Sequence, residues 1–278
     1  MMLLGTMTLL SVLSAAAIGW ASGAYGSWQW LWVLPVSFVG TWLGLFLLAF
    51  LFLWLMCAVV RLDKPQEADS PFYRKLADVY IQAVLKILRM RVHTRGLEQT
   101  PTEGRFLLVC NHINDMDPLT LLACFRHSQL AFISKRENQK LFLVGKIMHK
   151  LLCQPINREN DREALKTILR CVQILREDQA SVAVFPEGYT SRDGLFHGFR
   201  NGVFKIAQKA QVPIVVCTLQ NTQYVFRNAL RLKPTDVHLH LLAVIPPEEL
   251  KGLTAVAIGD RVHKLMADDL GPENVAES

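Results

Sequence analysis

The stretch Phe106-Leu-Leu-Val-Cys-Asn-His-Ile-Asn-Asp-Met-Asp-Pro118 determines how the rest of the chain is interpreted. Its first five residues form a short apolar run, which predicts a buried strand ending in Asn-His. Asp117 and Pro118 precede a second apolar run, and this order is typical of a helix start, with aspartate as the N-cap and proline at the first helical position. We therefore expect His112 at the end of a strand and Asp117 at the beginning of a helix.

The spacing of His112 and Asp117 leaves two interpretations open. On one continuous helix, residues five apart would lie about 140° apart around the axis. A turn between a strand and a helix can instead fold the carboxylate back onto the imidazole. Such a pairing fixes the tautomer and stabilises the imidazolium, as the carboxylate of a hydrolase triad does. In the structural alternative, Asp117 only caps a helix and His112 only ends a strand.

The first 60 residues contain no Asp, Glu, Lys, Arg or His. Over all 278 residues, 51% are hydrophobic and 19% are charged, which is slightly more apolar than is usual for a soluble protein. The uncharged first 60 residues account for this excess of apolar residues. A bilayer core is about 30 Å thick and needs about 20 apolar helical residues. We therefore expect residues 1–60 to form a transmembrane helical hairpin, with helices near 2–21 and 30–58. The alternative is a cleaved signal peptide with one anchor, and the lack of a basic region before the first apolar run argues against it.

Basic charge is concentrated just after this segment. Residues 61–95 contain eight basic and four acidic side chains, which give +4 of the formal net charge of +6. Cations beside a membrane span favour the cytoplasmic side and anionic lipid. We therefore expect the protein in the cytoplasmic membrane, with everything after residue 60 facing the cytoplasm. Basic charge could also indicate nucleic acid, but no nucleic-acid motif is present and the apolar anchor indicates a membrane.

The remaining chain divides into a basic linker with an amphipathic helix, 61–95, and an α/β domain, 96–278. Apolar residues at helical spacing predict a helix at 71–90, which either covers the sheet, the commoner use, or lies in the lipid interface. Alternating strand and helix patterns then predict a mostly parallel sheet flanked by helices. Strands are expected at 91–94, 106–110, 130–134, 154–157, 181–185, 214–219 and 237–244, and helices at 119–126, 139–152, 162–177, 201–210 and 254–269. In open sheets of this kind, the site lies at the carboxyl ends of the strands.

The six cysteines form no Cys-x-x-Cys pair and no zinc-binding spacing. They are Cys57, Cys110, Cys124, Cys153, Cys171 and Cys217. We expect most of them to be small buried apolar residues, in keeping with a reducing compartment.

Two further polar clusters follow predicted strands. After strand 181–185, Glu187 could bind or orient a hydroxyl, and Gly188 would let a ligand approach the backbone. The side chains that could hold an anion are Thr190, Ser191 and Arg192. Arg158 closes a short strand and could clamp a phosphate, because a guanidinium matches phosphate oxygens. Each cluster alone also has a structural interpretation, since Pro-Glu-Gly is a turn signal and a lone arginine commonly forms a surface ion pair.

Four sequence blocks follow one another as they do in a known family. The blocks are Asn111-His112 with Asp117, Asn157-Arg158, Phe185-Pro-Glu-Gly188 and Val212-Pro-Ile214. In these blocks the chain resembles the glycerolipid acyltransferases, especially the 1-acyl-sn-glycerol-3-phosphate acyltransferase family. The segment Phe132-Ile-Ser-Lys-Arg-Glu137 is also similar, and the resemblance covers roughly residues 75–270.

The resemblance implies an acyl transfer without a metal ion or bound cofactor. His112 is expected to be the general base toward the hydroxyl of a lysophosphatidic acid, and Asp117 is expected to orient it. The hydroxyl would attack the thioester of acyl-CoA or acyl-carrier protein, giving phosphatidic acid. The resemblance implies that the acceptor is held by Arg158, Glu187, Gly188 and Ser191. We add Arg192 to this set by our own inference.

The third block departs from the usual Phe-Pro-Glu-Gly-Thr-Arg-Ser of the family. Tyr189 and Thr190 stand where threonine and arginine are usual, so one expected phosphate ligand is missing, and Arg192 is a candidate substitute. These changes concern the acceptor more than the chemistry, and another lysophospholipid is an alternative acceptor. Two other classes remain open: a lipid hydrolase or thioesterase, although no Gly-x-Ser-x-Gly elbow is present, and a non-catalytic lipid-binding protein on the same fold.

Overall fold

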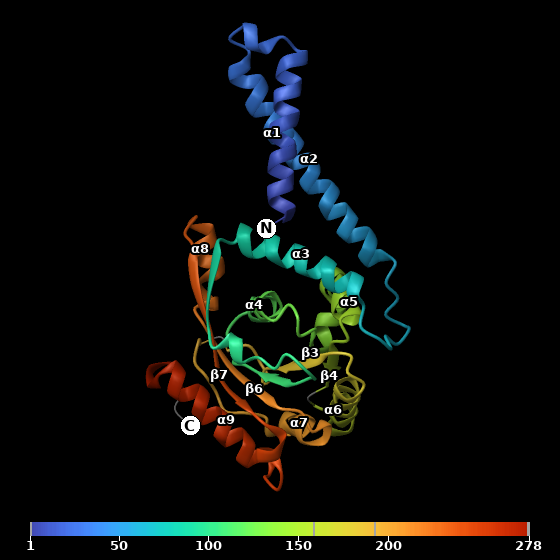
Figure 1. Ribbon diagram of the computed structural model, residues 1–278, viewed down its shortest axis with the longest axis vertical. Helices are drawn as coiled ribbons and strands as arrows, with labels where there is room; N and C mark the ends of the chain where they lie inside the picture. The colour runs from blue at the N-terminus through green and yellow to red at the C-terminus, as the bar shows by residue number, and fades with distance from the viewer. Residues whose placement is uncertain (1, 158, 192, 277–278) are drawn as a thin grey trace. The chain divides into compact units, whose positions relative to one another are not determined.

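The computed structural model describes residues 2–157, 159–191 and 193–276. Arg158 and Arg192, two of the predicted acceptor ligands, therefore lie outside the described residues. The chain forms two compact units, Met1–Asp63 and Lys64–Ser278 (Figure 1). Each unit is described by itself below.

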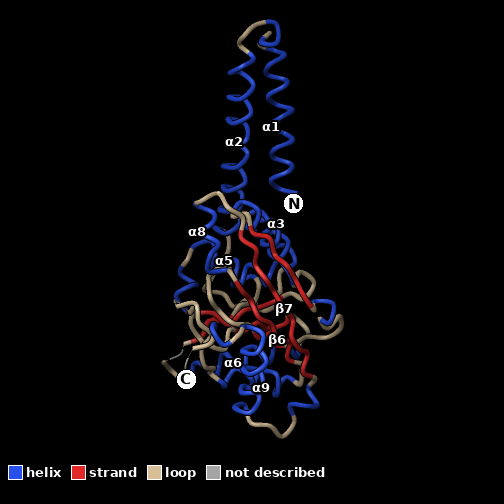
Figure 2. Tube along the Cα trace, turned by 90° about the vertical axis from the view of Figure 1, so that its left-hand side faces the viewer, coloured by secondary structure: helices blue, strands red, loops and turns tan. Residues whose placement is uncertain are grey.

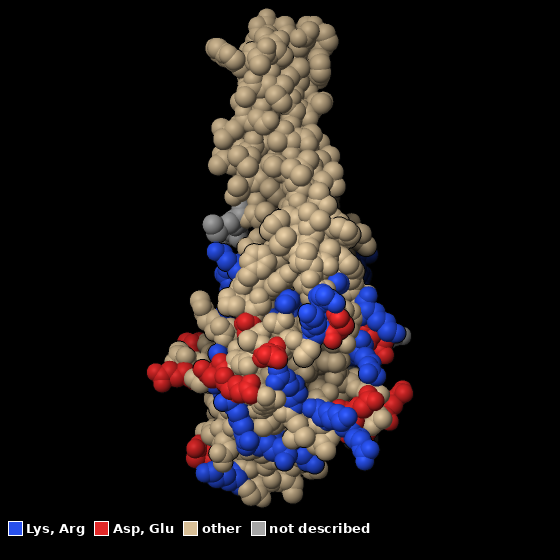
Figure 3. All heavy atoms as spheres, turned by 90° about the vertical axis from the view of Figure 1, so that its right-hand side faces the viewer, with Lys and Arg blue, Asp and Glu red and all other residues tan. Residues whose placement is uncertain are grey.

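The first unit consists of two long apolar helices. Helices α1 (Met2–Ala21) and α2 (Trp30–Ala58) lie side by side and run in opposite directions (Figures 1 and 2). The hydroxyls of Ser14 and Thr41 lie 3.1 Å apart between them. Both helices are long and apolar enough to cross a membrane, which confirms the predicted helices at 2–21 and 30–58. The charged side chains visible in Figure 3 all belong to the second unit or to the last residues of the first, since the first 60 residues contain none.

The second unit is built on one seven-stranded sheet. Its strands are β1 (Met90–Arg95), β2 (Leu107–Val109), β3 (Leu130–Lys135), β4 (Gln154–Ile156), β5 (Ser181–Val184), β6 (Ile214–Gln220) and β7 (Thr235–Ile245). Their order across the sheet is β1-β7-β6-β2-β5-β3-β4. Neighbouring strands are parallel except for the antiparallel pair β6 and β7. The predicted mostly parallel sheet is therefore confirmed, with every predicted strand present to within two residues at either end.

Helices cover both faces of this sheet. They are α3 (Pro71–Ile87), α4 (Asp117–Cys124), α5 (Phe142–Lys150), α6 (Asp161–Arg176), α7 (Lys205–Ala210), α8 (Val225–Leu230) and α9 (Ala255–Leu270). Figure 1 shows α3 and α4 on one face and α6, α7 and α9 on the other. The short helix α8 was not predicted from the sequence, whereas the other helices occur where they were expected.

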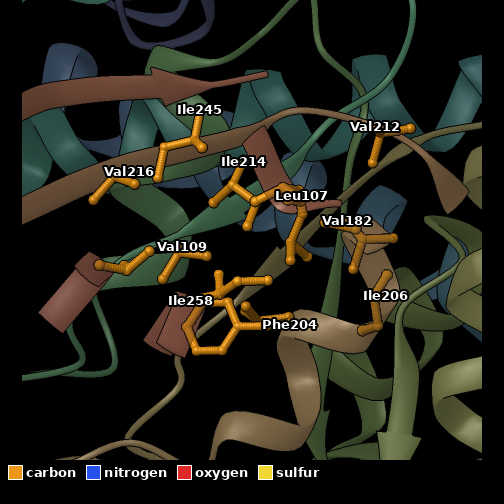
Figure 4. Close-up of a cluster of buried hydrophobic side chains, with 14 of the residues drawn as sticks. Leu107, Val109, Val182, Phe204, Ile206, Val212, Ile214, Val216, Ile245 and Ile258 are labelled. Carbon is orange, nitrogen blue, oxygen red and sulfur yellow. The ribbon is translucent and has the colours of Figure 1, made fainter. Parts of the chain in front are cut away.

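The central strands are apolar on both faces because both faces are covered. Leu107 and Val109 of β2 point to the same side of the sheet, toward Phe204 and Ile258 (Figure 4). Leu108 between them points to the opposite face, since side chains alternate along a strand, and it is also fully buried. A continuous apolar run is typical of such doubly covered parallel strands. Burying each Leu, Ile, Val or Phe side chain contributes about 1.5–3 kcal/mol to stability.

Helix α3 packs against the rest of the second unit, which is the commoner of its two predicted uses. Its buried residues are Tyr73, Leu76, Ala77, Ala83 and Leu85. Arg74 ties the helix to the sheet, because its guanidinium donates to the Leu130 carbonyl at 2.7 Å and forms an ion pair with Asp69. Phe72 and Ile87, near the two ends of the helix, stay more than half exposed.

Candidate active site

The predicted catalytic residues meet at one edge of the sheet. β2, β3, β5 and β6 are mutually parallel, so their carboxyl ends lie at the same edge. His112 follows β2, Glu187 follows β5 and Lys135 ends β3. The segment after β6, which contains Gln223 and Tyr224, also reaches this edge. A site at the carboxyl ends of parallel strands is the usual arrangement in open α/β sheets.

His112 and Asp117 form a direct hydrogen bond. His112 Nδ1 lies 2.9 Å from Asp117 Oδ2. The same oxygen accepts the backbone N–H groups of Ile113 at 2.7 Å and Asn114 at 2.8 Å, which identifies it as an acceptor only. Nδ1 therefore carries the proton, and the lone pair of the neutral imidazole is on Nε2. Of the two predicted arrangements, the carboxylate folded back onto the imidazole is the one observed.

The predicted N-cap role of Asp117 is wrong. Helix α4 begins at Asp117 itself, with Met116 before it, and no side chain caps the helix. The carboxylate instead points back into the turn that follows β2, where it is fully buried. Three donors, two of them backbone N–H groups of the turn, contact one of its oxygens. The same carboxylate therefore stabilises the turn and orients the His112 ring.

The Nε2 atom of His112 faces a hydroxyl. Thr190 Oγ1 lies 2.9 Å from it and donates, since Nε2 carries the lone pair. The imidazole also stacks on Phe185, with ring centroids 4.2 Å apart and an angle of 16° between the planes. Fixed on one face by Phe185 and at Nδ1 by Asp117, the imidazole is held in one orientation. A hydroxyl at 2.9 Å from Nε2 is at the distance required for proton transfer to a general base.

Glu187 holds the backbone on which His112 sits. Its Oε1 accepts the backbone N–H of His112 at 2.8 Å, and its Oε2 accepts that of His197 at 3.2 Å. The carboxyl group is nearly fully buried, and this burial raises its pKa to about 7. Ser191 completes the connection, because its backbone N–H donates to the His112 carbonyl at 2.8 Å. The first and third sequence blocks are thus hydrogen-bonded through the backbone of His112.

The structure explains the residue type at two more positions of the sequence blocks, Gly188 and Asn111. Gly188 has φ 83°, and a Cβ atom there would come within 2.8 Å of the Arg200 side chain. The position therefore favours glycine for both backbone and packing reasons. Asn111 is buried, and its side-chain amide exchanges hydrogen bonds of 2.7 and 2.9 Å with the backbone of Leu219 on β6. It continues the pairing of β2 with β6 after the strand itself has ended.

Ser191 points away from His112. Its hydroxyl lies 2.7 Å from Asp193 Oδ1, and the Asp193 carboxylate also contacts His197 Nε2 at 3.0 Å. The Ser191 hydroxyl and the His197 ring hold the pKa of the Asp193 carboxyl well below its usual range. Ser191 therefore shapes the loop after Glu187 through this small network.

A cleft of about 750 Å³ opens beside Thr190. Its lining includes Asn114, Lys135, Thr190, Ser191, Gln223 and Tyr224. Gln223 and Tyr224 were missed from the sequence, because they lie on the turn after β6, far along the chain from any motif that suggests chemistry. Lys135 belongs to the segment that resembles the acyltransferases, but a role for it was not predicted. The predicted residues His112, Asp117, Glu187, Gly188 and Ser191 all lie at this edge, and Arg158 and Arg192 are outside the described residues.

A comparison with protein-family models gives one match for this region: residues 91–220 match the model described as acyltransferase. Residues 91–220 are therefore similar to an acyltransferase domain. The matched segment contains His112, Asp117 and the whole of the third block. It ends at Gln220, just before the turn that carries Gln223 and Tyr224.

Several curated proteins are similar to this chain. A chloroplastic 1-acyl-sn-glycerol-3-phosphate acyltransferase of Arabidopsis thaliana is 32% identical over 48% of this chain, which is 36% of that protein. The chain thus spans about a third of this relative's length. A 1-acyl-sn-glycerol-3-phosphate acyltransferase of Borreliella burgdorferi is 25% identical over 69% of this chain and 80% of its own. The crystal structure of the 1-acyl-sn-glycerophosphate acyltransferase PlsC from Thermotoga maritima superposes with a TM-score of 0.57, over 70% of this chain and 78% of that one, at 20% identity. That likeness establishes the fold.

The cysteines of the protein are unsuited to nucleophilic attack. All six are free thiols, and all but the half-buried Cys124 are buried. Burial raises the pKa of Cys110 well above its usual value and that of Cys171 to about 12. A thiol with such a raised pKa stays protonated at neutral pH, and the thiolate is the reactive form. The buried cysteines are therefore poor candidates for an acyl-enzyme.

The raised pKa of Glu187 predicts a pH-dependent stability. The folded protein binds this proton up to about pH 7, whereas the unfolded chain releases it near 4.5. The folded state thus holds more protons between these values, so stability falls as pH rises through this window, by about 3 kcal/mol at most. Thermal unfolding from pH 4.5 to 8 should show this slope, and the difference between parent and Glu187→Gln should isolate it. Identical slopes in the two proteins would contradict the assignment.

Proposed function

We propose that the protein transfers an acyl chain from a thioester to the free hydroxyl of 1-acyl-glycerol-3-phosphate at a membrane, forming phosphatidic acid. The observation that carries the proposal is the His112–Asp117 pair, whose Nε2 faces a hydroxyl at 2.9 Å beside a cleft in an acyltransferase domain. We choose 1-acyl-glycerol-3-phosphate as the acceptor because the similar proteins are named for it.

The proposed reaction needs only groups that the site and substrates provide. The acceptor hydroxyl would replace the Thr190 hydroxyl at His112 Nε2 and lose its proton to it as its oxygen bonds to the thioester carbon. The carbon–sulfur bond then breaks, and the thiolate leaves as coenzyme A or carrier-protein thiol after taking the proton from the imidazolium. Asp117 stabilises the imidazolium in between. No metal ion or bound cofactor has a part in this scheme.

The acceptor phosphate requires cations, and Lys135 is the basic residue among the described lining of the cleft. Asp115 and Asp193 also line it, so the described lining residues alone carry a net negative charge. We propose that Arg158, and Arg192 in place of the third-block arginine, supply the additional positive charge. A related lysophospholipid remains the alternative acceptor.

Removal of one arginine should weaken acceptor binding selectively. Arg158→Ala should raise the acceptor KM roughly 10- to 150-fold and leave the donor KM nearly unchanged, because one charge-assisted contact is worth about 1.5–3 kcal/mol. Arg192→Ala should behave in the same way. Arg95→Ala is the matched control, since this exposed arginine ends β1, which runs opposite to the site-bearing strands. Unchanged discrimination between phosphate-bearing and phosphate-free acceptors in both variants would exclude the clamp.

The two apolar helices of the first unit support an integral membrane location, with the second unit in the cytoplasm. The protein should stay with membranes in high salt, because salt screens surface charge but does not weaken apolar insertion. A reporter that works only in the cytoplasm should be active when it is fused after Ser278. Activity of a reporter that works only outside the cytoplasm would contradict this topology.

One assay tests the proposed reaction directly. Purified full-length protein is incubated with acyl-CoA and a panel of lysophospholipids, and free thiol is measured together with the lipid product. Thiol release that requires lysophosphatidic acid, with equal formation of phosphatidic acid, is the expected result. Thiol release without any acceptor would identify a thioesterase instead.

The Thr190 hydroxyl supports thioester hydrolysis as a second candidate function. Thr190 Oγ1, His112 and Asp117 are hydrogen-bonded in the order nucleophile, base and carboxylate. In that reaction Oγ1 would bond to the thioester carbon, His112 would pass the hydroxyl proton to the leaving thiolate, and water would then cleave the acyl-threonine. Mass spectrometry of the protein after incubation with acyl-CoA alone separates the candidates. An acyl adduct that is absent from Thr190→Val would support hydrolysis, and no adduct is expected for direct transfer.

A further inference from the structure

The short helix α8 and the turn after it expose large apolar side chains to solvent. Leu230 is 89% exposed, Leu232 is 75% exposed and Phe226 is 48% exposed. Phe226 and Leu230 are four residues apart on α8 and therefore lie on the same side of the helix. Large apolar side chains that are exposed close together on a folded protein are a feature of interaction sites.

The same segment is strongly basic. Arg227, Arg231 and Lys233 alternate with the apolar residues and are exposed, and residues 194–235 contain no Asp or Glu. In the part of the chain that the structure describes, none of these three cations forms an ion pair. We refer to Phe226, Arg227, Leu230, Arg231, Leu232 and Lys233 together as the α8 surface.

The α8 surface is held firmly by the fold. Val225 at its start is fully buried. The backbone N–H groups of Arg231 and Lys233 both donate to the Asn228 carbonyl, and the Asn228 side chain donates to Thr235. Leu232 has φ 55°, a backbone conformation that favours glycine. Its side chain is also mostly exposed, so packing inside the protein does not account for a leucine at this position. A well-ordered surface that exposes apolar side chains is suited to bind a bilayer or another molecule.

The α8 surface continues onto the end of α3 and toward the cleft. The Arg89 guanidinium donates to the Leu232 carbonyl, and Figures 1 and 2 show α8 beside the end of α3. That end adds the exposed residues Lys86, Ile87 and Arg89. On the other side, α8 directly follows Gln223 and Tyr224, which line the cleft. The α8 surface therefore begins two residues after Tyr224 of the cleft lining.

We propose that the α8 surface docks the second unit onto an anionic phospholipid bilayer. The apolar side chains would enter the interfacial region, and the basic side chains would lie at the lipid phosphates. An acidic carrier protein would match the charge, but it offers little to three protruding apolar side chains, whereas a bilayer interface accommodates both. The docking does not depend on the reaction at His112, so its test stands apart from the test of acyl transfer.

A polarity-sensitive fluorophore on the α8 surface tests the docking in the full-length protein. The parent is reconstituted in nanodiscs of phosphatidylcholine with or without phosphatidylglycerol, and an NBD label is attached at Leu230→Cys. Val256→Cys, on an exposed apolar residue of α9, is the matched control, and the labelled parent gives the cysteine background. In phosphatidylglycerol discs, the label at 230 should emit at shorter wavelength and be quenched several-fold more by lipid-borne nitroxide than the label at 256.

Charge reversal provides the second arm. Arg227→Glu, Arg231→Glu and Lys233→Glu combined should abolish the blue shift at 230 in the anionic discs, while the thermal unfolding temperature stays near that of the parent. Equal emission at 230 and 256 in anionic discs would overturn the proposal, and so would a shift at 230 that is the same without phosphatidylglycerol. Protection of the label by an added acidic carrier protein but not by lipid would assign the surface to that partner and also overturn it.

Discussion

Replacement of His112 by alanine should lower kcat at least about 100-fold, within the range for loss of a general base. An acceptor hydroxyl is a poor nucleophile at neutral pH, so its proton must be removed as the new bond to the thioester carbon forms. The lone pair of His112 Nε2 is oriented toward a hydroxyl at 2.9 Å, with Nδ1 fixed by Asp117. Among the described residues around the cleft, no other side-chain base has both of its nitrogen atoms held by hydrogen bonds in this way.

The His112→Ala experiment needs a control for loss of packing. The substitution removes the stacking on Phe185, but the backbone hydrogen bonds of residue 112 to Glu187 and Ser191 remain. His197→Ala is the matched variant, since His197 also lies on the loop network and is bonded to Asp193 away from Thr190. Its kcat should change far less. Parent-like kcat in His112→Ala, measured as lipid product formed per unit time, would exclude the proposed base.

The mechanism also predicts an order of events. A thiolate leaves readily, so a base and an orienting carboxylate suffice without a covalent acyl-enzyme, and the kinetics should indicate a ternary complex instead of a ping-pong scheme. The Thr190 hydroxyl occupies the position at Nε2 that the acceptor hydroxyl needs, so it could itself be acylated. The kinetic pattern therefore distinguishes direct transfer from transfer through an acyl-threonine. Thr190→Val should keep transfer activity if the hydroxyl only fills that position.

The sheet and the contact between His112 and Asp117 could be predicted from the sequence because their signals are local. Short apolar runs such as 106–110 mark strands covered on both faces, and the five-residue spacing of His112 and Asp117 lies within one turn. Contacts between distant residues could not be predicted in this way. The hydrogen bonds from Thr190 to His112 and from Asn111 to Leu219 join residues 78 and 108 positions apart.

Two further differences have physical causes. Asp117 followed by proline is a common helix start, but three donors in the preceding turn attract the carboxylate more strongly than the helix end does. Helix α8 has six residues, too few for a periodic apolar pattern, and its large apolar side chains face solvent. A pattern search based on burial therefore misses the element on which the proposed docking depends.

Asp117→Asn should also lower kcat at least about 100-fold, while the unfolding temperature barely changes. In one orientation, the asparagine carbonyl takes the place of Oδ2 and keeps the hydrogen bonds to His112, Ile113 and Asn114. Its NH₂ group then occupies the place of Oδ1, which is buried and has no partner among the described residues, so no existing hydrogen bond is lost. Only the negative charge disappears, and with it the stabilisation of the imidazolium that forms during proton transfer.

The opposite orientation of the introduced asparagine amide leads to the same loss of activity by another route. If its NH₂ group faces His112, Nδ1 must accept, and the proton moves to Nε2, where the base is needed. Asp115→Asn, which removes a carboxylate from the same turn without touching His112, is the control and should lower kcat far less. Steady-state kinetics with saturating lysophosphatidic acid, paired with thermal unfolding, separate the roles. A fully active Asp117→Asn variant would exclude the catalytic pair, and a loss of activity that only follows a fall in unfolding temperature would reduce Asp117 to a structural residue of the turn.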